Sequence, residues 1–451
     1  MMKSFHLLQS LNSYLQELVG GPLMIAAVLL TGCYLTLRLQ WPQLRYFTSM
    51  LRNTVFAIGQ QGSGSGAISS FQALTTALAA TIGTGNIAGV AAAITLGGPG
   101  AVFWLWFSAF LGMVTKYAEV VLAVHYRHTR AAGDAVGGPM YFLAKGLNSQ
   151  VLAALFALFG SLAAFGIGNM VQANSVAAAM HEAFNVSQLQ TGLIMAAITA
   201  AVIIGGISRI AAFTEKLVPL MAAFYSLSAL IIIFLNRQRL PLAFSQIISG
   251  AFTGRAAVGG FAGASVLQAF RFGVARGIFT NEAGLGSASI AHAAARTDHP
   301  ARQGLWGMFE VFFDTHISCT LTALTILVTE VWHSGLDGAA LSAAAFNAAL
   351  PGVGGYLTAI ALVFFAFSTL ISWSYYGEKC FEYLVGTRAT LFYRLLWIIL
   401  IPVGAVGGLR AVWSLADTLN GLMAVPNLIG LWGLNGIIVK LTRDFFKKRQ
   451  H

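Results

Sequence analysis

Three closely spaced glycines interrupt an apolar stretch that is otherwise long enough to form one membrane helix: Gly83, Gly85 and Gly89. Glycine weakens a helix wherever it lies inside one. The same stretch carries three polar side chains that close helix packing does not need, those of Thr81, Thr84 and Asn86. We therefore expect the helix to break at residues 82–86. In lipid, such a break persists only where protein or a water-filled cavity satisfies the freed backbone groups.

The two sides of this break offer opposite chemistry. The helix that begins after it presents free amides and positive dipole density at Thr84 and Gly85, where a substrate carboxylate fits. The helix that ends before it presents free carbonyl oxygens near Ala79 and Ile82, which suit a small cation such as sodium. The alternative is that the glycines serve only the close packing of helices.

Hydroxyl side chains gather in a second apolar span, at Ser368, Thr369 and Ser372. These oxygens could complete a cation shell together with the carbonyls of the first break. The alternative is that each hydroxyl donates to a carbonyl of its own helix, which is common for Ser and Thr.

Two amide side chains, Gln172 and Asn174, lie in a further apolar span. An amide oxygen can accept a hydrogen bond from a substrate ammonium without adding charge. Amides also join neighbouring membrane helices, with about 0.6 kcal/mol for an average interaction. Both interpretations stay open for this pair.

Ionisable residues inside apolar spans are functional candidates by default. Asp314 is such an acid, with Glu310 and His316 close to it in sequence, and a proton-binding or a structural role is open for it. Arg276 precedes a second glycine-rich interruption at 277–286, where it could pair with Glu282 or line an outer vestibule. Asn281 belongs to the same interruption, so these residues are candidates for gating or coupling, together with Asn86. Lys116 and Glu119, three residues apart, are expected to form a structural pair.

The composition is that of an integral membrane protein. Of the 451 residues, 57% are hydrophobic and 9% are charged, whereas soluble domains carry about 25% charged residues. The net charge of +11 comes from basic residues scattered singly between apolar segments, and not from a patch of the kind that binds nucleic acid. The three cysteines, widely separated in apolar runs, offer neither a disulfide framework nor a metal-ligand spacing.

Apolar spans of about twenty residues, the length that a bilayer requires, number eleven. They lie near 20–38, 65–95, 99–124, 151–180, 190–208, 214–235, 261–295, 303–330, 354–377, 390–409 and 412–438. With the N-terminus outside, eighteen of the 26 Lys and Arg residues fall on the inner side, five on the outer side and three within spans. Basic residues favour the cytoplasmic side. The sequence therefore predicts an outer N-terminus and an inner C-terminus.

Without the first span, ten spans remain and divide into two sets of five. An odd number per set means that the two halves insert in opposite senses, and each half begins with an interrupted span. Matching interruptions in inverted repeats point to the central site of a secondary transporter. We therefore expect an all-α fold of about 11 transmembrane helices, a LeuT-like 5+5 inverted repeat after one extra helix. The expected segments are an N-terminal segment with an inner linker (1–64), a first repeat (65–236), an outer connection with a short helix (237–260), a second repeat (261–440) and a basic cytoplasmic tail (441–451).

Enzyme chemistry is not indicated. The histidines have no partners at the spacing of a metal site or of a nucleophile, and no P-loop is present. The sequence predicts no catalytic residue, no cofactor and no use of ATP.

Four motifs together resemble the alanine or glycine:cation symporter family, the bacterial sodium:alanine symporters. They are Ala80–Val90 (ATIGTGNIAGV), Gly97–Gly100 (GGPG), Gly137–Tyr141 (GGPMY) and Asn281–Ala288 (NEAGLGSA). The resemblance covers the chain from about residue 65. It implies a LeuT-like fold, a location in a bacterial cytoplasmic (inner) membrane, and inward uptake of alanine or glycine coupled to sodium.

The resemblance also implies roles for individual residues. Substrate contacts are implied at Thr84, Gly85, Gln172, Phe279, Thr369 and Trp373. Sodium contacts are implied at Ala79, Ile82, Ser368 and Thr369. Phe279 and Trp373 would crowd a side chain much larger than methyl.

These observations predict a symporter that binds a small neutral amino acid and sodium near the midplane and works by alternating access. One alternative on the same scaffold is a proton-coupled or exchange-mode transporter in which Asp314 or Glu282 titrates. Another alternative is an amino-acid-gated channel or receptor.

Overall fold

A computed structural model of the protein describes residues 21–59, 64–129, 135–253, 266–407 and 410–447, with Asn12, Tyr14, Gln16 and Val19. The side chains of residues 410–413 are not among those described. Parts of the predicted N-terminal segment, of the outer connection and of the basic tail lie outside the described residues.

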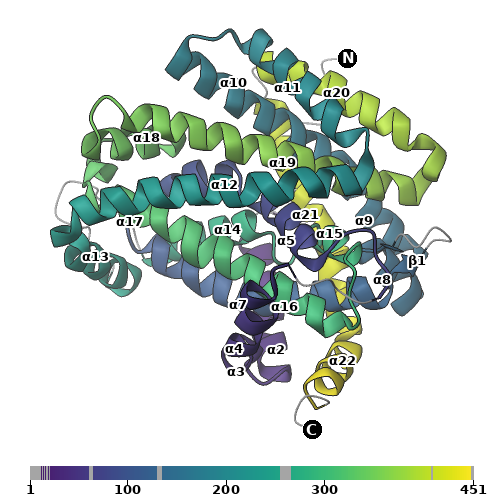
Figure 1. Ribbon diagram of the computed structural model, residues 1–451. Coiled ribbons are helices and arrows are strands. Elements are labelled where there is room, and N and C mark those ends of the chain that lie inside the picture. Colours follow the sequence, from purple (N-terminus) through teal and green to yellow (C-terminus); the bar gives the residue numbers. More distant parts are fainter. Residues whose placement is uncertain are drawn as a thin grey trace.

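The described chain is almost entirely helical (Figure 1). Its α-helices are α2 (Pro22–Arg38), α3 (Pro42–Arg45), α4 (Phe47–Asn53), α5 (Ser70–Thr81), α6 (Val90–Gly97), α7 (Ala101–His125), α8 (Pro139–Gly146), α9 (Gln150–Ala163), α10 (Val171–Phe184), α11 (Gln188–Ile203), α12 (Gly206–Leu235), α13 (Leu240–Phe252), α14 (Val266–Asn281), α15 (Ser289–Ala293), α16 (Pro300–Val311), α17 (Thr320–Val328), α18 (Gly338–Ala349), α19 (Gly354–Val385), α20 (Thr390–Val406), α21 (Arg410–Gly433) and α22 (Asn435–Lys447).

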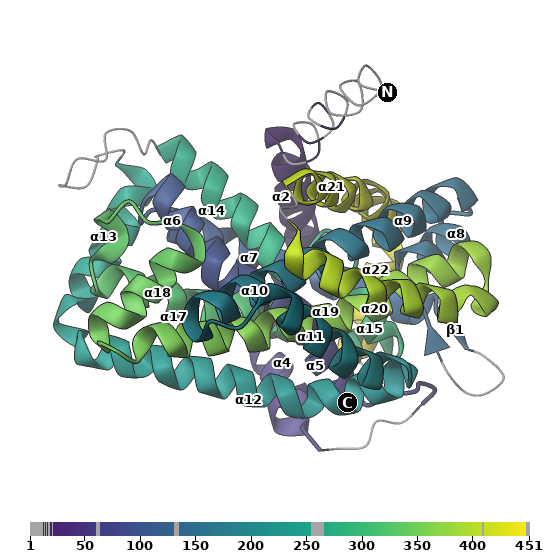
Figure 2. The ribbon, with the colours of Figure 1, turned by 90° about the horizontal axis from the view of Figure 1, so that it is seen from above.

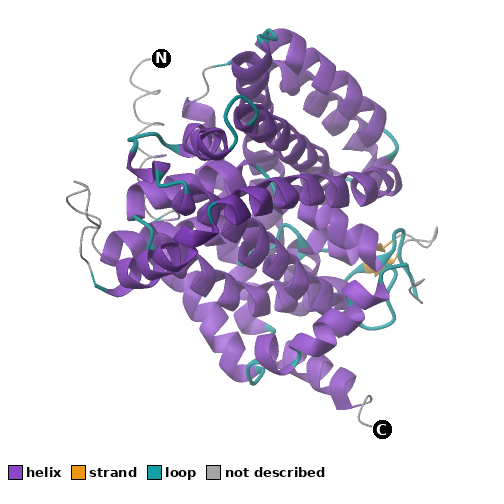
Figure 3. Ribbon diagram, turned by 60° about the vertical axis from the view of Figure 1, so that its left-hand side comes forward, coloured by secondary structure: helices purple, strands orange, loops and turns teal. Residues whose placement is uncertain are grey.

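Three π-helical segments interrupt or extend these helices: η2 (Gly85–Gly89), η3 (Ala164–Met170) and η5 (Phe312–Cys319). Short 3-10 turns lie at Val55–Ala57, Arg237–Arg239, Val331–His333 and Thr387–Ala389. Two short strands, β1 (His128–Thr129) and β2 (Ala135–Val136), pair antiparallel, with His128 opposite Val136 (Figure 3).

Within the described residues, six helices are long and apolar enough to cross a bilayer, or eight if each of two bent pairs is one span. This number is lower than the eleven expected, because the helices at three of the expected places, α2, α11 and α14, have only 17, 16 and 16 residues. The sequence predicts no span at α18, and the structure has a short apolar helix there. A helix lies at each of the eleven expected places, but not every one of these helices is long and apolar enough to count as a membrane span.

Helix α7 lies deep in the molecule, and most of its residues are buried. It packs against α14 and α16, and a helix that is apolar all round belongs in such a position. Seen from above, α6, α13, α14, α17 and α18 gather on one side, and α8, α9, α20 and α21 gather on the other (Figure 2). The long helices α12 and α19 cross the molecule near one another (Figure 1).

The first helix break lies where the sequence predicts it. A capping box begins α5, in which Ser69 Oγ accepts from the Gln72 amide at 3.0 Å and Gln72 Oε1 accepts from the Ser69 amide at 3.0 Å. The helix ends at Thr81, and the next helical segment begins at Gly85. The axis bends by 54° between the two parts.

The second break lies later in the chain than expected. Helix α14 continues through Gly277 to Asn281, so the interruption covers 282–288 and not 277–286. Gly277 serves packing instead, because a Cβ there would collide with the Ser108 side chain and lie 3.2 Å from the Leu105 carbonyl. The glycines that the break itself uses are Gly284 and Gly286, both with positive φ (98° and 81°).

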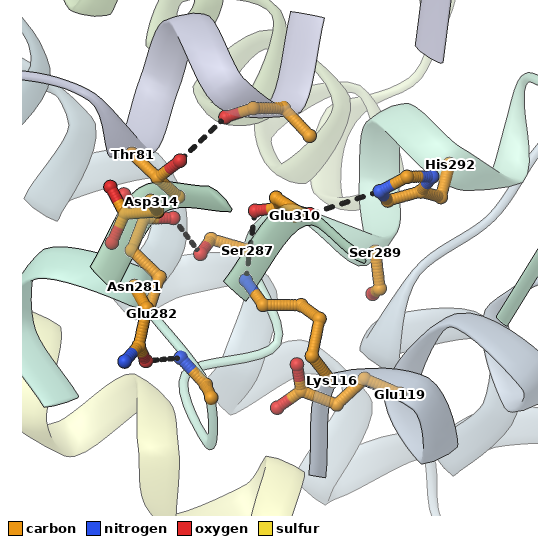
Figure 4. Close-up of polar contacts among 12 residues, drawn as sticks. Thr81, Lys116, Glu119, Asn281, Glu282, Ser287, Ser289, His292, Glu310 and Asp314 are labelled. Carbon is orange, nitrogen blue, oxygen red and sulfur yellow. Dashed lines mark hydrogen bonds and ion pairs between the residues drawn. The ribbon is translucent and has the colours of Figure 1, made fainter. Parts of the chain in front are cut away.

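A buried ion pair joins α7 to α16 beside the second break (Figure 4). Lys116 Nζ lies 3.3 Å from Glu310 Oε1, and His292 Nε2 lies 3.0 Å from Glu310 Oε2, with all three side chains fully buried. The expected pairing of Lys116 with Glu119 is therefore wrong. Glu119 instead accepts from the Gly284 amide at 2.8 Å.

We expect Lys116→Met to lower the thermal unfolding temperature of the purified protein, because Glu310 would lose its cation. Removing one partner of a buried pair costs about 3–5 kcal/mol, whereas removing both charges costs less. The double variant Lys116→Met/Glu310→Gln should therefore unfold at a higher temperature than Lys116→Met alone, since the amide can still accept from His292. Equal or greater destabilisation of the double variant would contradict a stabilising ion pair.

Candidate functional site

A small cavity of about 20 Å³ lies where the first break, the end of α14, η3, α10, α19 and α21 meet, and we call it the central cavity. Its lining residues are Ala80, Thr81, Gly83, Thr84, Gly85, Ile167, Gln172, Phe279, Thr280, Glu282, Thr369, Trp373 and Asn420. All six residues that the sequence predicts to contact substrate belong to this lining. The volume is room for a water-sized molecule. Side chains around the cavity must therefore move apart before an amino acid can enter.

The amide side of the cavity is built by the start of the helix that follows the first break. Thr84 is the N-cap of η2 and Gly85 is its first residue, and the first amides of a helix have no acceptor within that helix. The Gly83 amide donates to Asn86 Oδ1 at 3.0 Å, so one freed group of the break is satisfied locally. A helix start of this kind is suited to bind an anion.

On the carbonyl side, α5 ends against the hydroxyl groups of α19. Ser368 Oγ donates to the Ala79 carbonyl at 3.2 Å, and Thr369 Oγ1 donates to the Ala80 carbonyl at 3.3 Å. Both hydroxyls are also within hydrogen-bond distance of the Phe365 carbonyl, one turn earlier in their own helix, at 2.9 and 3.0 Å. The hydrogen bonds to their own helix are thus present, and the contacts with α5 place a group of oxygens between the two helices.

Ile82, the remaining predicted cation ligand, precedes Gly83, whose Cα faces Thr369. A Cβ on Gly83 would lie 2.7 Å from Thr369 Oγ1. The structure therefore brings the end of α5, Ser368 and Thr369 together. A hard cation such as sodium is suited by oxygen ligands of this kind.

The structure separates the two amides that the sequence could not distinguish. Gln172 lines the central cavity, and its Nε2 donates to the Ile167 carbonyl at 3.0 Å. Its Oε1 is buried and has no hydrogen-bond partner among the described residues. Asn174 instead donates to the carbonyls of Gly404 and Gly407, at 3.3 and 3.1 Å, and joins α10 to the end of α20. Gln172 is the candidate ligand and Asn174 is a helix-joining residue.

Phe279 and Asn420 line both the central cavity and a much larger cavity of about 660 Å³, which we call the vestibule. The vestibule is lined by the first half of α2 and by parts of α14 and α21, and it includes Arg271, Arg276 and Asp417. The Arg276 guanidinium lies 5.9 Å from the centre of the Phe279 ring. Of the two roles expected for Arg276, the structure shows that it lines a vestibule and does not form an ion pair with Glu282.

One group of candidate gating residues, Asn86, Asn281 and Asp314, lies around the π-helical segment η5. Asn86 Nδ2 donates to Asp314 Oδ1 at 2.8 Å, and Asn281 Nδ2 donates to Thr315 Oγ1 at 3.2 Å, so residues 314 and 315 of η5 contact both breaks. The side chains of Glu310 and His316 are not hydrogen-bonded to Asp314.

Glu282 belongs to the cavity itself and not to the group around Asp314. Its Oε1 accepts from Trp373 Nε1 at 3.0 Å, and its Oε2 accepts from Ser287 Oγ. One carboxylate of the second break is thereby connected to the aromatic wall of the cavity.

Six lining residues were not among the predicted ligand or gating residues: Ala80, Thr81, Gly83, Ile167, Thr280 and Asn420. Asn420 gave a signal, because it is an amide inside an apolar span, and its Oδ1 is buried without a partner among the described residues. Ala80 and Ile167 gave none, because an apolar residue in an apolar helix carries no mark of the cavity that it faces.

A solved structure shares this fold. A manganese transporter of Eremococcus coleocola, solved in complex with an aromatic bis-isothiourea substituted compound, superimposes with a TM-score of 0.50 over 85% of this chain and 82% of that chain. The two sequences are 15% identical, so the likeness concerns the fold alone.

Comparison with known sequences gives the relationship. The chain is 50% identical to the sodium/alanine symporter AgcS of Methanococcus maripaludis, over 98% of each chain. It is 38% identical to a probable sodium/glutamine symporter, GlnT, of Bacillus subtilis, over 98% of this chain and 92% of that protein. Residues 5–451 match the sequence pattern of the sodium:alanine symporter family. The chain therefore belongs to the sodium:alanine symporter family, a family of membrane transporters and not of enzymes.

Proposed function

We propose that the protein is a secondary active symporter that couples inward uptake of a small neutral amino acid, alanine or glycine, to the sodium gradient. The observation that carries this proposal is the juxtaposition at the first break. Helix-start amides at Thr84 and Gly85 lie within a few residues of a group of oxygens between α5 and α19. One relative, 50% identical, is named a sodium/alanine symporter, which supports the same pair of ligands.

The substrate carboxylate would accept hydrogen bonds from the amides of Thr84 and Gly85. Gln172 Oε1, buried and unpartnered, would accept from the ammonium, while Phe279 and Trp373 limit the side chain to about the size of methyl. Sodium would be bound by the carbonyls of Ala79 and Ile82 and by Ser368 and Thr369. Each ligand thus fits an end of the broken helix with the opposite charge.

Access would alternate as the two groups of helices rock about this site, under a LeuT-like arrangement of two inverted repeats. The vestibule is lined by the first half of α2, which the distribution of basic residues places outside. Movement of Phe279 would open the central cavity to it. Asn86, Asn281 and Asp314 would couple the two broken helices during this change.

The sodium gradient is sufficient for uphill transport. A membrane potential of about 100 mV supplies about 2.3 kcal/mol per charge. A tenfold sodium gradient adds about 1.4 kcal/mol. One sodium ion could therefore support accumulation of a neutral amino acid by a few hundredfold.

We expect a sodium gradient alone to drive alanine accumulation in proteoliposomes, and a proton gradient alone not to do so, because the proposed coupling ion is sodium. Radiolabelled alanine uptake with each gradient imposed separately measures this. Alanine accumulation without sodium would favour the proton-coupled or exchange-mode alternative. Equilibration without accumulation under either gradient would indicate a channel or receptor.

Thr369→Ala should raise the sodium concentration for half-maximal uptake about tenfold, because loss of one hydroxyl ligand is comparable to loss of a hydrogen bond. The rate at saturating sodium should change much less. Thr358→Ala is the matched control, since Thr358 lies on the same helix and donates to the Gly354 carbonyl at 3.0 Å. Unchanged sodium dependence in Thr369→Ala would remove Thr369 from the sodium shell.

Gly85→Val should abolish alanine binding while the protein still folds. A Cβ at Gly85 would meet Thr280 Oγ1 at 3.4 Å and Phe279 at 3.7 Å, which are ordinary contacts, so the added side chain occupies cavity space rather than breaking the core. Equilibrium alanine binding and thermal unfolding measure the two effects. Gly436→Ala serves as a control, because a Cβ there meets nothing within 4 Å. Normal transport by Gly85→Val would refute the close approach of substrate to this backbone.

A further inference from the structure

Glu282 occupies a backbone position that suits glycine better than glutamate. It follows the last residue of α14 with a φ of 55°, in the left-handed region that helix ends commonly assign to glycine. The same loop uses glycine at its two other positions of positive φ, Gly284 and Gly286. A strained position that retains a long side chain suggests that the side chain has a use.

The carboxylate of Glu282 is buried and forms no ion pair with a described residue. The residue is 5% exposed and lines the central cavity, and its two described partners, Trp373 and Ser287, are neutral donors. Among the described residues, no basic nitrogen lies within ion-pair distance of it. Lys116 pairs with Glu310 at 3.3 Å. Burial of an unpaired carboxylate is costly, so a positive charge that enters the cavity would be strongly stabilised there.

Side chains other than Glu282 also hold the loop in place, and Figure 4 shows the contact that Asn281 makes. Glu119 Oε1 accepts from the Gly284 amide at 2.8 Å, and Asn427 Nδ2 donates to the Gly284 carbonyl at 2.8 Å. Asn281 Oδ1 accepts from the Ala283 amide at 3.0 Å. A purely structural role for Glu282 would therefore duplicate contacts that already exist.

We propose that Glu282 is the anionic partner of the substrate ammonium group, an inference that rests on the proposed amino-acid transport. The cavity then has two charged ends: the amides of Thr84 and Gly85 face the carboxylate, and Glu282 faces the ammonium, with Gln172 Oε1 as a second acceptor. The Trp373 indole, through its hydrogen bond to Glu282, orients the carboxylate. The site thereby selects zwitterionic α-amino acids over hydroxy acids of the same size.

Equilibrium competition binding tests this inference, with radiolabelled alanine as the probe and unlabelled alanine or lactate as the competitor. Lactate has a hydroxyl where alanine has an ammonium. Glu282→Gln should weaken alanine binding by about tenfold or more, as expected for loss of a charge-assisted hydrogen bond, and should reduce the preference for alanine over lactate. Glu282→Asp, which keeps the charge, should retain most of the preference.

Glu119→Gln is the matched control, because it neutralises a carboxylate of the same buried region that holds the loop but does not line the cavity. It should leave the preference for alanine over lactate unchanged. A wild-type preference in Glu282→Gln would overturn the inference. Since binding is measured without gradients, this outcome is distinct from failure of the proposed function, which would appear as wild-type protein without sodium-driven alanine uptake.

A second measurement uses the unaltered protein, should Glu282→Gln fail to fold. Dicyclohexylcarbodiimide modifies buried carboxyl groups, and mass spectrometry locates the modified residue. Alanine should protect Glu282 from this reaction and lactate should not, while modification of Glu119 should be equal in both cases. Equal modification of Glu282 with and without alanine would overturn the inference.

Discussion

The structure depends on one constraint: a backbone group freed by a helix break inside a membrane must find a partner. At the first break, Asn86 meets much of this requirement. Its Oδ1 accepts from the Gly83 amide, its Nδ2 donates to Asp314, and its own carbonyl accepts from Thr322 Oγ1 at 2.8 Å. Ser342 Oγ donates to the next carbonyl, that of Ile87, at 3.0 Å. Because side chains from α17, α18 and η5 satisfy these groups, the end facing the central cavity stays available for a ligand.

The π-helical segments fall where the site needs them. η2 begins at Gly85, η3 contains Ile167, and η5 contains Asp314, so each either lines the central cavity or contacts the first break. A π-helical turn inserts a residue into a helix and is frequent at functional sites. Here these turns let long helices continue while the side chains along them change direction.

Buried charge is distributed around the second break rather than concentrated at one residue. Lys116, Glu310 and His292 form one group, which joins α7, α15 and α16. Glu119 and Asn427 fix the loop at Gly284, and Glu282 faces the cavity. These groups surround the Glu282 carboxylate, whose described hydrogen-bond partners, Trp373 and Ser287, are neutral. This division lets a site for a zwitterion lie inside a firmly held loop.

The sequence alone determined the membrane class, the family resemblance and the first break. Composition, glycine spacing and polar side chains inside apolar spans report local preferences that tertiary packing does not need to supply. Gln172 and Asn174 show the limit, because both are amides on one helix and only the packing of α10 against α19 and α20 decides which of them faces the cavity. Lys116 shows the same limit: its sequence neighbour Glu119 was visible, but its partner Glu310 is 194 residues away. Gly277 belongs to a continuous helix because α7 packs against it, and the break moves to 282–288. Spacing along a chain reveals what a segment can do, whereas long-range contacts between helices decide which of these possibilities is realised.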